Sequence, residues 1–445
     1  KIRLRAIDAK LAKLKLTFGE NVLAETNKYQ LHLTNEVDLD GLPEGEKEAA
    51  AQLAVSKGKE EGWMITLDYP SYIPFMKYAK NRELRKELSL AFGSKGFHND
   101  KLDNQNNVLD IVKLRFERAN LLGYKTHADF VLEERMAQTP EKVHSFLNEL
   151  LEKAKPAAER EFQQLENFAK KIDGIDRLEK WDGSFYSEKL KQELFDLDDE
   201  KLKPYFKLEN VIKGVFKVAE NLFDLHFEEV NDIEKYHDEV KTYKVYDTDK
   251  NFVSLFYADF HPRTGKRGGA WMTSYKSQWK RNGENVRPHI SNVCNFTPST
   301  KSKPSLLTFN EVTTLFHEFG HGLHGMLANT TYPSLSGTSV FWDFVELPSQ
   351  ILENWCYEKE ALELFATHYE TGETIPMTLV QKIKESATFQ EGMQTLRQLS
   401  FGLLDMSWHG IDPSKITNVK AHEDEAFKNT TLYPETPETC MSTAF

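Results

Sequence analysis

Cysteine is scarce in this chain of 445 residues, and long apolar runs are missing. The three cysteines, Cys294, Cys356 and Cys440, are scattered and contain no CxxC pair, which excludes a dense disulfide framework and indicates a reducing compartment. No continuous apolar stretch of about 20 residues occurs, so no segment is expected to span a membrane. An initiator methionine and an apolar signal region are also absent from the opening residues. We therefore expect a piece of a longer precursor, located in the cytoplasm, or in the periplasm if a signal segment precedes Lys1.

Positive charge is in deficit, with 57 lysines and arginines against 69 aspartates and glutamates, so that the net charge is −12. This balance disfavours a polyanion, and no nucleic-acid partner is expected. Hydrophobic residues make up 40% of the chain, which is enough to bury a large core. The composition therefore indicates a folded protein and leaves its oligomeric state open.

Apolar residues follow the helical period over the first two hundred residues and again from position 308 onward. Thr139 and Pro140, an N-cap followed by proline at the first helical position, predict the start of one helix. Between these helical regions, β-prone runs predict short strands at 243–246, 253–257, 270–272 and 291–296. The expected fold class is mainly α with one small antiparallel β-sheet.

The most informative motif is an HExxH sequence inside a predicted helix. Thr308 and Glu311 have the spacing of a capping box, and the helical period continues beyond them through His317-Glu318-Phe319-Gly320-His321. Four residues advance a helix by about 400°, so His317 and His321 project from one face, as two ligands of a single zinc ion require. Glu318 lies about 100° away and suits a general base for a water molecule.

Two glycines, Gly320 and Gly322, interrupt this helix at a cost of about 1 kcal/mol each relative to alanine. Because glycine is unfavourable at these positions, we expect another part of the chain to approach this surface of the helix closely.

A zinc site of this kind needs a third protein ligand. His324 lies seven residues after His317, about 10.5 Å along the helix axis, which is too far for both to bind one ion. It is interpreted as a structural histidine or as a partner of a ligand. Asp343 and Glu346 lie among apolar neighbours, where coordinating a cation would offset the cost of burying a carboxylate. One of them could bind the metal and Asp343 could instead orient a ligand histidine, and the spacing alone does not choose between them.

Two of these segments, 316–324 (FHEFGHGLH) and 343–350 (DFVELPSQ), resemble the zinc helix and third-ligand segment of the thimet oligopeptidase family of zinc metallopeptidases. Within that family the bacterial peptidyl-dipeptidases are the nearer resemblance. In the family pattern the glutamate before Leu-Pro-Ser-Gln is a zinc ligand, which implies one zinc ion held by His317, His321 and Glu346, with Asp343 orienting a ligand. Further similarity covers essentially the whole chain, through 63–68, 81–85, 119–124 and 266–272.

The resemblance also implies an architecture, a two-lobed helical ellipsoid around a deep channel with the small sheet near the zinc site. We expect a helical lobe at 1–205, a mixed α/β segment at 206–300 and a zinc-binding helical region at 301–445. In the family, the segment like 433–445 is followed by a stretch rich in glycine and tyrosine that stabilises the oxyanion. The chain is therefore expected to lack both ends of a longer enzyme.

The strand around 292–296 resembles the sheet edge that pairs with the substrate backbone, and Ala270, Asn292, Cys294 and Asn295 are the candidate substrate-binding residues. Simple sheet packing explains these residues about equally well. The expected function is zinc-dependent hydrolysis of short peptides, with Glu318 as general base and release of C-terminal dipeptides. The alternatives are a broader oligoendopeptidase of the same family, or a metal-binding fragment without activity.

Overall fold

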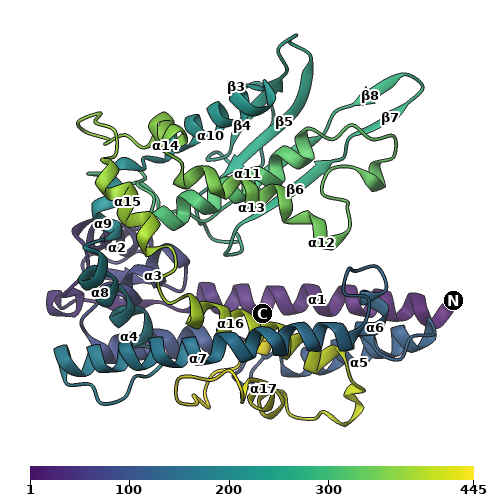
Figure 1. Cartoon of the computed structure of the whole chain (residues 1–445), viewed down its shortest axis with the longest axis horizontal. Helices are drawn as coiled ribbons and strands as arrows, with labels where there is room; N and C mark the ends of the chain where they lie inside the picture. The colour runs from purple at the N-terminus through teal and green to yellow at the C-terminus, as the bar shows by residue number, and fades with distance from the viewer. Residues whose placement is uncertain (445) are drawn as a thin grey trace.

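The computed structural model describes residues 1–444, in which two stacked bodies are joined at one end (Figure 1). The lower body is helical, with α1 (Ile2–Lys28), α5 (Gln105–Leu121), α6 (His127–Leu132), α7 (Pro140–Asp173), α16 (Glu391–His409) and α17 (Val419–Phe427). The upper body holds the main sheet together with α10 (Leu208–Phe223), α11 (Phe309–Met326), α12 (Trp342–Val345), α13 (Leu347–Glu353) and α14 (Lys359–Phe365). This arrangement confirms the mainly helical, two-lobed fold.

The joining end is also mostly helical. It contains α2 (Glu44–Ser56), α3 (Tyr69–Tyr78), α4 (Arg82–Gly93), α8 (Gly183–Phe195), α9 (Asp199–Leu202) and α15 (Met377–Ser386). A short antiparallel pair, β1 (Leu31–Leu33) and β2 (Trp63–Ile65), packs beside α2.

The main sheet has five strands in the order β3-β4-β5-β9-β6. Their bounds are β3 (His226–Val230), β4 (Lys241–Tyr246), β5 (Phe252–Asp259), β6 (Trp271–Lys276) and β9 (His289–Val293). The strands predicted at 243–246 and 253–257 are present as β4 and β5 and pair antiparallel. The expectation of a purely antiparallel sheet is wrong, because β9 runs parallel to β5. The chain leaves β5, forms β6 one position further out, makes the hairpin of β7 (Trp279–Arg281) and β8 (Glu284–Val286), and returns to insert β9 between them. The outer edge of the sheet on this side is therefore β6.

Helix α11 lies against one face of this sheet. Phe256 of β5 and Phe319 of α11 have ring centroids 5.6 Å apart, and Phe216 of α10 contacts Phe319 at 5.7 Å. Because side chains alternate along a strand, Phe256 and Ala258 face this core together, and both are buried. The largest hydrophobic core therefore supports the helix that carries the HExxH sequence.

In the lower body α7 and α16 pack along each other. The predicted N-cap is confirmed, since the Thr139 hydroxyl accepts a hydrogen bond from the backbone N–H of Lys142. Leu147 of α7 is buried in one cluster with Leu399 and Met406 of α16. Although the expected partition groups α16 and α17 with the zinc-binding region, these helices pack in the lower body.

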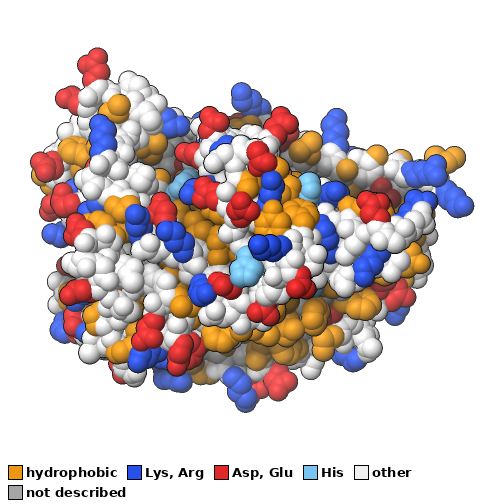
Figure 2. Space-filling view, turned by 90° about the horizontal axis from the view of Figure 1, so that it is seen from above, with side chains coloured by type: hydrophobic (Ala, Val, Ile, Leu, Met, Phe, Trp, Pro, Cys, Tyr) orange, Lys and Arg blue, Asp and Glu red, His pale blue; other side chains and the backbone are white. Residues whose placement is uncertain are grey.

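No helix among the described residues has the length and apolar character needed to cross a membrane. On the face seen in Figure 2, lysine and arginine side chains alternate with acidic ones and do not gather into one continuous band.

Candidate metal centre

The helix that carries the motif begins where the sequence predicts. Thr308 and Glu311 form a complete capping box, in which each side chain accepts from the backbone N–H of the other residue. Glu311 Oε1 also accepts from the backbone N–H of Thr297 at 2.7 Å, which ties the helix start to the segment leaving β9. The first turn of α11 is therefore fixed to the sheet.

Three side chains converge at one point beside α11. Oε2 of Glu346, at the junction of α12 and α13, lies 3.2 Å from Nε2 of His317 and 3.1 Å from Nε2 of His321. Ligand atoms about 2.0–2.1 Å from a tetrahedral zinc ion lie about 3.3 Å from one another, so these separations fit three corners of such a site. Within residues 1–444, no other three histidine, cysteine or acidic side chains bring their ligand atoms within 4.8 Å of one another. Two imidazoles and one carboxylate, with a fourth corner for water, form the donor set of a catalytic zinc site.

Both glycines in the motif have a close neighbour. A Cβ on Gly320 would lie 2.6 Å from the Pro348 carbonyl oxygen and 2.6 Å from Cα of Ser349. A Cβ on Gly322 would lie 2.9 Å from Oδ1 of Asn292. Gly320 therefore lets α13 approach α11 closely enough for Glu346 to reach the two histidines.

The orientation of His317 is fixed by Glu353, a residue that the sequence analysis did not single out. Nδ1 of His317 lies 2.6 Å from Oε1 of Glu353, at the end of α13. Because an ionised carboxylate only accepts, Nδ1 carries the hydrogen and Nε2 keeps its lone pair toward Glu346 and His321.

Asp343, expected to orient a ligand histidine, has its side-chain hydrogen bond elsewhere among the described residues. Oδ2 of Asp343 accepts from the backbone N–H of Met136, in the loop between α6 and α7, at 3.1 Å. The helix expected through this region is divided at Glu346 into α12 and α13, so Asp343 does not share the face of α13 that meets α11.

Glu318 lies beside the side chains of His317, His321 and Glu346, and one of its carboxyl oxygens has no partner among the described residues. Its side chain is 6% exposed, and the oxygen without a hydrogen-bond partner is the buried Oε2. Burial raises the pKa of Glu318 to about 7; His317 opposes this rise and the charge of Glu346 adds to it. A carboxyl group of this kind can accept and return a proton near neutral pH.

The state of the second histidine also suits metal binding. Burial lowers the pKa of His321, although the nearby Glu346 carboxylate acts in the opposite direction. Metal binding requires a neutral imidazole, so this environment favours the ligating form. His324 remains outside the cluster, with its ring centroid 6.0 Å from that of Phe344.

The four candidate substrate-binding residues occupy different environments. Asn292 and Cys294 are buried, and Nδ2 of Asn292 donates to the Glu318 carbonyl oxygen at 2.6 Å, which braces α11 against β9. Asn295 is partly exposed and its Nδ2 donates to the carbonyl oxygens of Arg267 and Gly269. Ala270, partly exposed, directly precedes β6.

The strand expected to be the substrate edge is interior. β9 pairs on both sides, and the Cys294 N–H continues the pairing by donating to the Asp259 carbonyl oxygen at 2.8 Å. The unpaired side belongs to β6, where Ala270 lies at the strand's start. The free edge of the sheet on this side is therefore β6 and not the predicted strand, β9.

Known proteins resemble this chain over most of its length. The model of peptidase family M3 matches residues 75–444. Oligopeptidase A of Haemophilus influenzae is 40% identical over 418 residues, covering 93% of this chain and 61% of the relative. Dipeptidyl carboxypeptidase of Escherichia coli is 35% identical over 416 residues, with the same two coverages. The chain thus spans about three-fifths of the length of these curated relatives.

A solved structure shows the same fold at low identity. The X-ray structure of an oligoendopeptidase F has a TM-score of 0.50 and 14% sequence identity, and the match covers 96% of this chain and 59% of that chain. At this identity the likeness concerns the fold alone.

Proposed function

The chain belongs to peptidase family M3, and we propose that it carries the zinc centre of an oligopeptidase that cleaves bonds within short peptides. The observation that carries the proposal is the convergence of His317, His321 and Glu346 beside a buried, unpaired Glu318. Three neutral or anionic donors and a carboxyl group with a pKa near 7 are the parts that hydrolysis by a zinc peptidase needs.

His317, His321 and Glu346 would hold the metal, which supplies a Lewis acid for water and for the scissile carbonyl. Glu318 takes the proton from the attacking water and returns it to the leaving amine. Glu353 keeps the His317 ring in its ligating orientation. Glu318 would therefore transfer the proton, while the two histidines and Glu346 would hold the metal.

The substrate backbone would add to the free edge of β6. Strand addition gives grip through main-chain hydrogen bonds and leaves side-chain selection to neighbouring pockets. Ala270, which directly precedes this edge, would contact the substrate backbone. Asn295 would hold the neighbouring 267–269 loop in place through its hydrogen bonds to the Arg267 and Gly269 carbonyl oxygens. Asn292 and Cys294 would not contact the substrate directly. They would support the site by holding α11 and β9 in position.

Release of C-terminal dipeptides is the second candidate activity. Its support is the 35% identity to dipeptidyl carboxypeptidase, against 40% for oligopeptidase A over a similar length. The higher identity favours cleavage within peptides over the dipeptide release expected from the sequence.

The test compares one short peptide with a free and with an amidated C-terminus. We expect both forms to be cleaved at internal bonds, with Glu318→Gln losing about 10²–10⁴-fold in rate while its zinc content is unchanged. Glu360→Gln, on the exposed side of α14, is the matched control and should keep the parental rate. Cleavage of the free form alone, two residues from its end, would instead establish the dipeptidase activity. Full activity of Glu318→Gln would contradict the proposed mechanism.

A further inference from the structure

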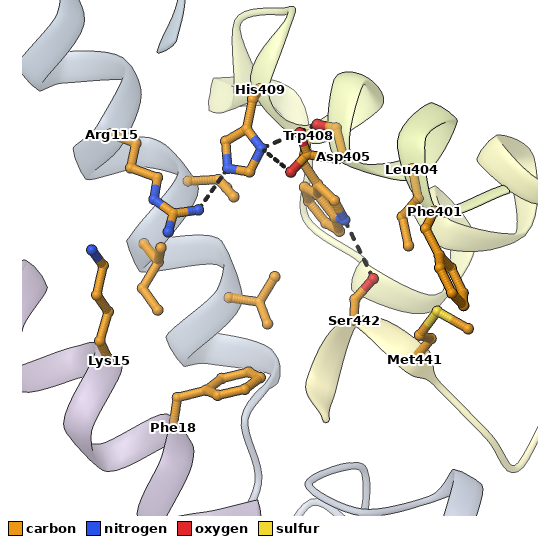
Figure 3. Close-up of a pocket in the computed structure, with 13 residues that line it drawn as sticks. Lys15, Phe18, Arg115, Phe401, Leu404, Asp405, Trp408, His409, Met441 and Ser442 are labelled. Atoms are coloured by element: carbon orange, nitrogen blue, oxygen red, sulfur yellow. Dashed lines mark hydrogen bonds and ion pairs between the residues drawn. The ribbon is translucent and has the colours of Figure 1, made fainter. Parts of the chain in front are cut away.

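A separate pocket lies in the lower body, between α1, α5, α16 and the 441–442 segment (Figure 3). It has a volume of about 420 Å³, within the range of small-molecule sites. Its wall is mostly apolar and includes Phe18, Val108, Val112, Leu404, Trp408 and Met441. The Trp408 indole N–H donates to Oγ of Ser442 at 3.3 Å, so that this wall presents its apolar surface to the pocket.

Two cationic side chains border this apolar wall. Lys15 of α1 and Arg115 of α5 extend from neighbouring helices into the same part of the pocket in Figure 3. Within the described part of the chain, Lys15 makes no hydrogen bond or ion pair, and Arg115 makes no ion pair. Arg115 is partly buried, and burial lowers the pKa of its guanidinium, although the nearby Asp405 carboxylate acts in the opposite direction. For the partly buried guanidinium of Arg115, a position beside apolar surface is costly, and an anion bound there would offset the cost.

His409 forms a hydrogen bond with the guanidinium of Arg115 but supplies no negative charge to it. Nδ1 of His409 lies 3.1 Å from Oδ1 of Asp405, and Nε2 lies 2.8 Å from Nη1 of Arg115. Since the guanidinium can only donate, Nε2 accepts and the imidazole is neutral. Asp405 is the one acidic side chain lining the pocket, so the lining carries two positive charges against one negative, a surplus of one. The remaining N–H groups of Arg115 are available to a ligand.

We propose that this pocket binds a medium-chain aliphatic carboxylate, with its hydrocarbon chain on the apolar wall and its carboxylate between Lys15 and Arg115. The surplus of one positive charge matches a monoanion, and the planar guanidinium matches the geometry of a carboxylate. The site lies in the lower body, whereas the candidate metal centre is in the upper one (Figure 1). The binding is thus a property separate from peptide hydrolysis.

Isothermal titration of the chain with decanoate, below the micelle concentration, tests the proposal. We expect saturable binding, at least about tenfold weaker binding by Arg115→Gln and by Lys15→Gln, and little binding of decyltrimethylammonium, which has the same chain and the opposite charge. Lys13→Gln removes the same charge from the same helix outside the pocket lining and should bind decanoate as the parent does.

Lys15 is exposed, so Lys15→Gln keeps the test valid even where Arg115→Gln fails to fold, which thermal unfolding would reveal. The proposal is overturned if the parent chain binds no decanoate, or if decyltrimethylammonium binds equally well. It is also overturned if Lys15→Gln and Lys13→Gln have the same affinity as the parent.

Discussion

Glu353 and His317 are joined by a 2.6 Å contact between Oε1 and Nδ1 that spans 36 residues of sequence. The contact ties the end of α13 to the middle of α11 and selects the tautomer in which Nε2 is free to bind a metal. The proposed metal centre therefore depends on a residue outside the three side chains proposed to hold the ion.

Replacing Glu353 should weaken zinc binding while leaving all three ligands in place. In Glu353→Gln the acceptor for Nδ1–H is weaker and the ring orientation is less fixed, so we expect a loss of about 10–100-fold in zinc affinity. Competition with a chromogenic chelator measures this change. Asp343→Asn is the matched control, because among residues 1–444 the Asp343 side chain bonds to the Met136 N–H and to no other group, and this variant should bind zinc like the parent. Equal losses in the two variants would refute the assignment of Glu353.

The packing of α11 on α13 should not tolerate a methyl group at Gly320. The Cβ of Gly320→Ala would meet backbone atoms of Pro348 and Ser349 at 2.6 Å, so α13 must shift and carry Glu346 with it. We expect about 1–3 kcal/mol of destabilisation in urea unfolding and weaker zinc binding.

Gly19→Ala serves as the control for helix propensity, because nothing lies within 4 Å of a Cβ there. This change in α1 should stabilise the chain by about 1 kcal/mol. A stabilising effect of Gly320→Ala would contradict the account that Gly320 is needed for the close packing of α13 on α11.

The zinc helix could be predicted from the sequence because its signals are local. Thr308, Glu311 and the HExxH residues lie within one helix, where spacing alone gives relative direction. The role of Glu353 depends on how two helices pack. The sequence gives one indication of this role: Glu353 lies seven residues after Glu346, which is two helical turns further along on nearly the same face. The contact of Asp343 with the Met136 N–H could not be predicted either, because α12 ends at Val345 and α13 begins at Leu347, so spacing along one helix does not apply across Glu346.

The sheet shows a similar division. The hairpin of β4 and β5 could be predicted because consecutive strands with a turn between them usually pair. The interior place of β9 could not, because its partners β5 and β6 are set by pairing between distant segments. Likewise, the apolar stripe of α7 predicts a buried face but does not identify α16, over two hundred residues later, as its partner.

Lys95 should make stability depend on pH. Its side chain is 8% exposed, its Nζ lies 3.8 Å from the centroid of Phe92, and burial lowers its pKa to about 8, although Asp68 opposes the shift. Between pH 8 and 10.5 the unfolded chain keeps a proton on this lysine that the folded chain has released. The free energy of unfolding should therefore rise with pH across this window, by about 3 kcal/mol from this group.

Urea unfolding of the parent and of Lys95→Met, measured from pH 7.5 to pH 10.5, isolates this contribution. The variant should be more stable near pH 7.5, and the gap should close as pH rises. A gap that does not change with pH would show that Lys95 titrates normally in the folded chain.

A buried ion pair should stabilise the joining end of the molecule. Nζ of Lys203 lies 2.6 Å from Oε1 of Glu46 in α2, and both side chains are 9% exposed. Nζ also lies 2.7 Å from Oε1 of Glu200, whose side chain is 30% exposed. Lys203→Met therefore leaves the buried Glu46 carboxylate and the Glu200 carboxylate without their cation, so we expect a loss of about 3–5 kcal/mol in unfolding free energy. The double change Lys203→Met with Glu46→Leu should recover part of it, because Glu200 still lacks its cation. Lys217→Met, from an exposed pair with Glu220, should change little. A double variant no more stable than Lys203→Met would contradict this account.

The central claim is that Glu346 completes a zinc site with His317 and His321. Zinc content per chain after dialysis, measured by elemental analysis for the parent and for Glu346→Ala, tests it most directly. We expect one zinc ion per parent chain and loss of most of it from Glu346→Ala, with both proteins folded by circular dichroism. Equal zinc content in the two proteins would contradict the account.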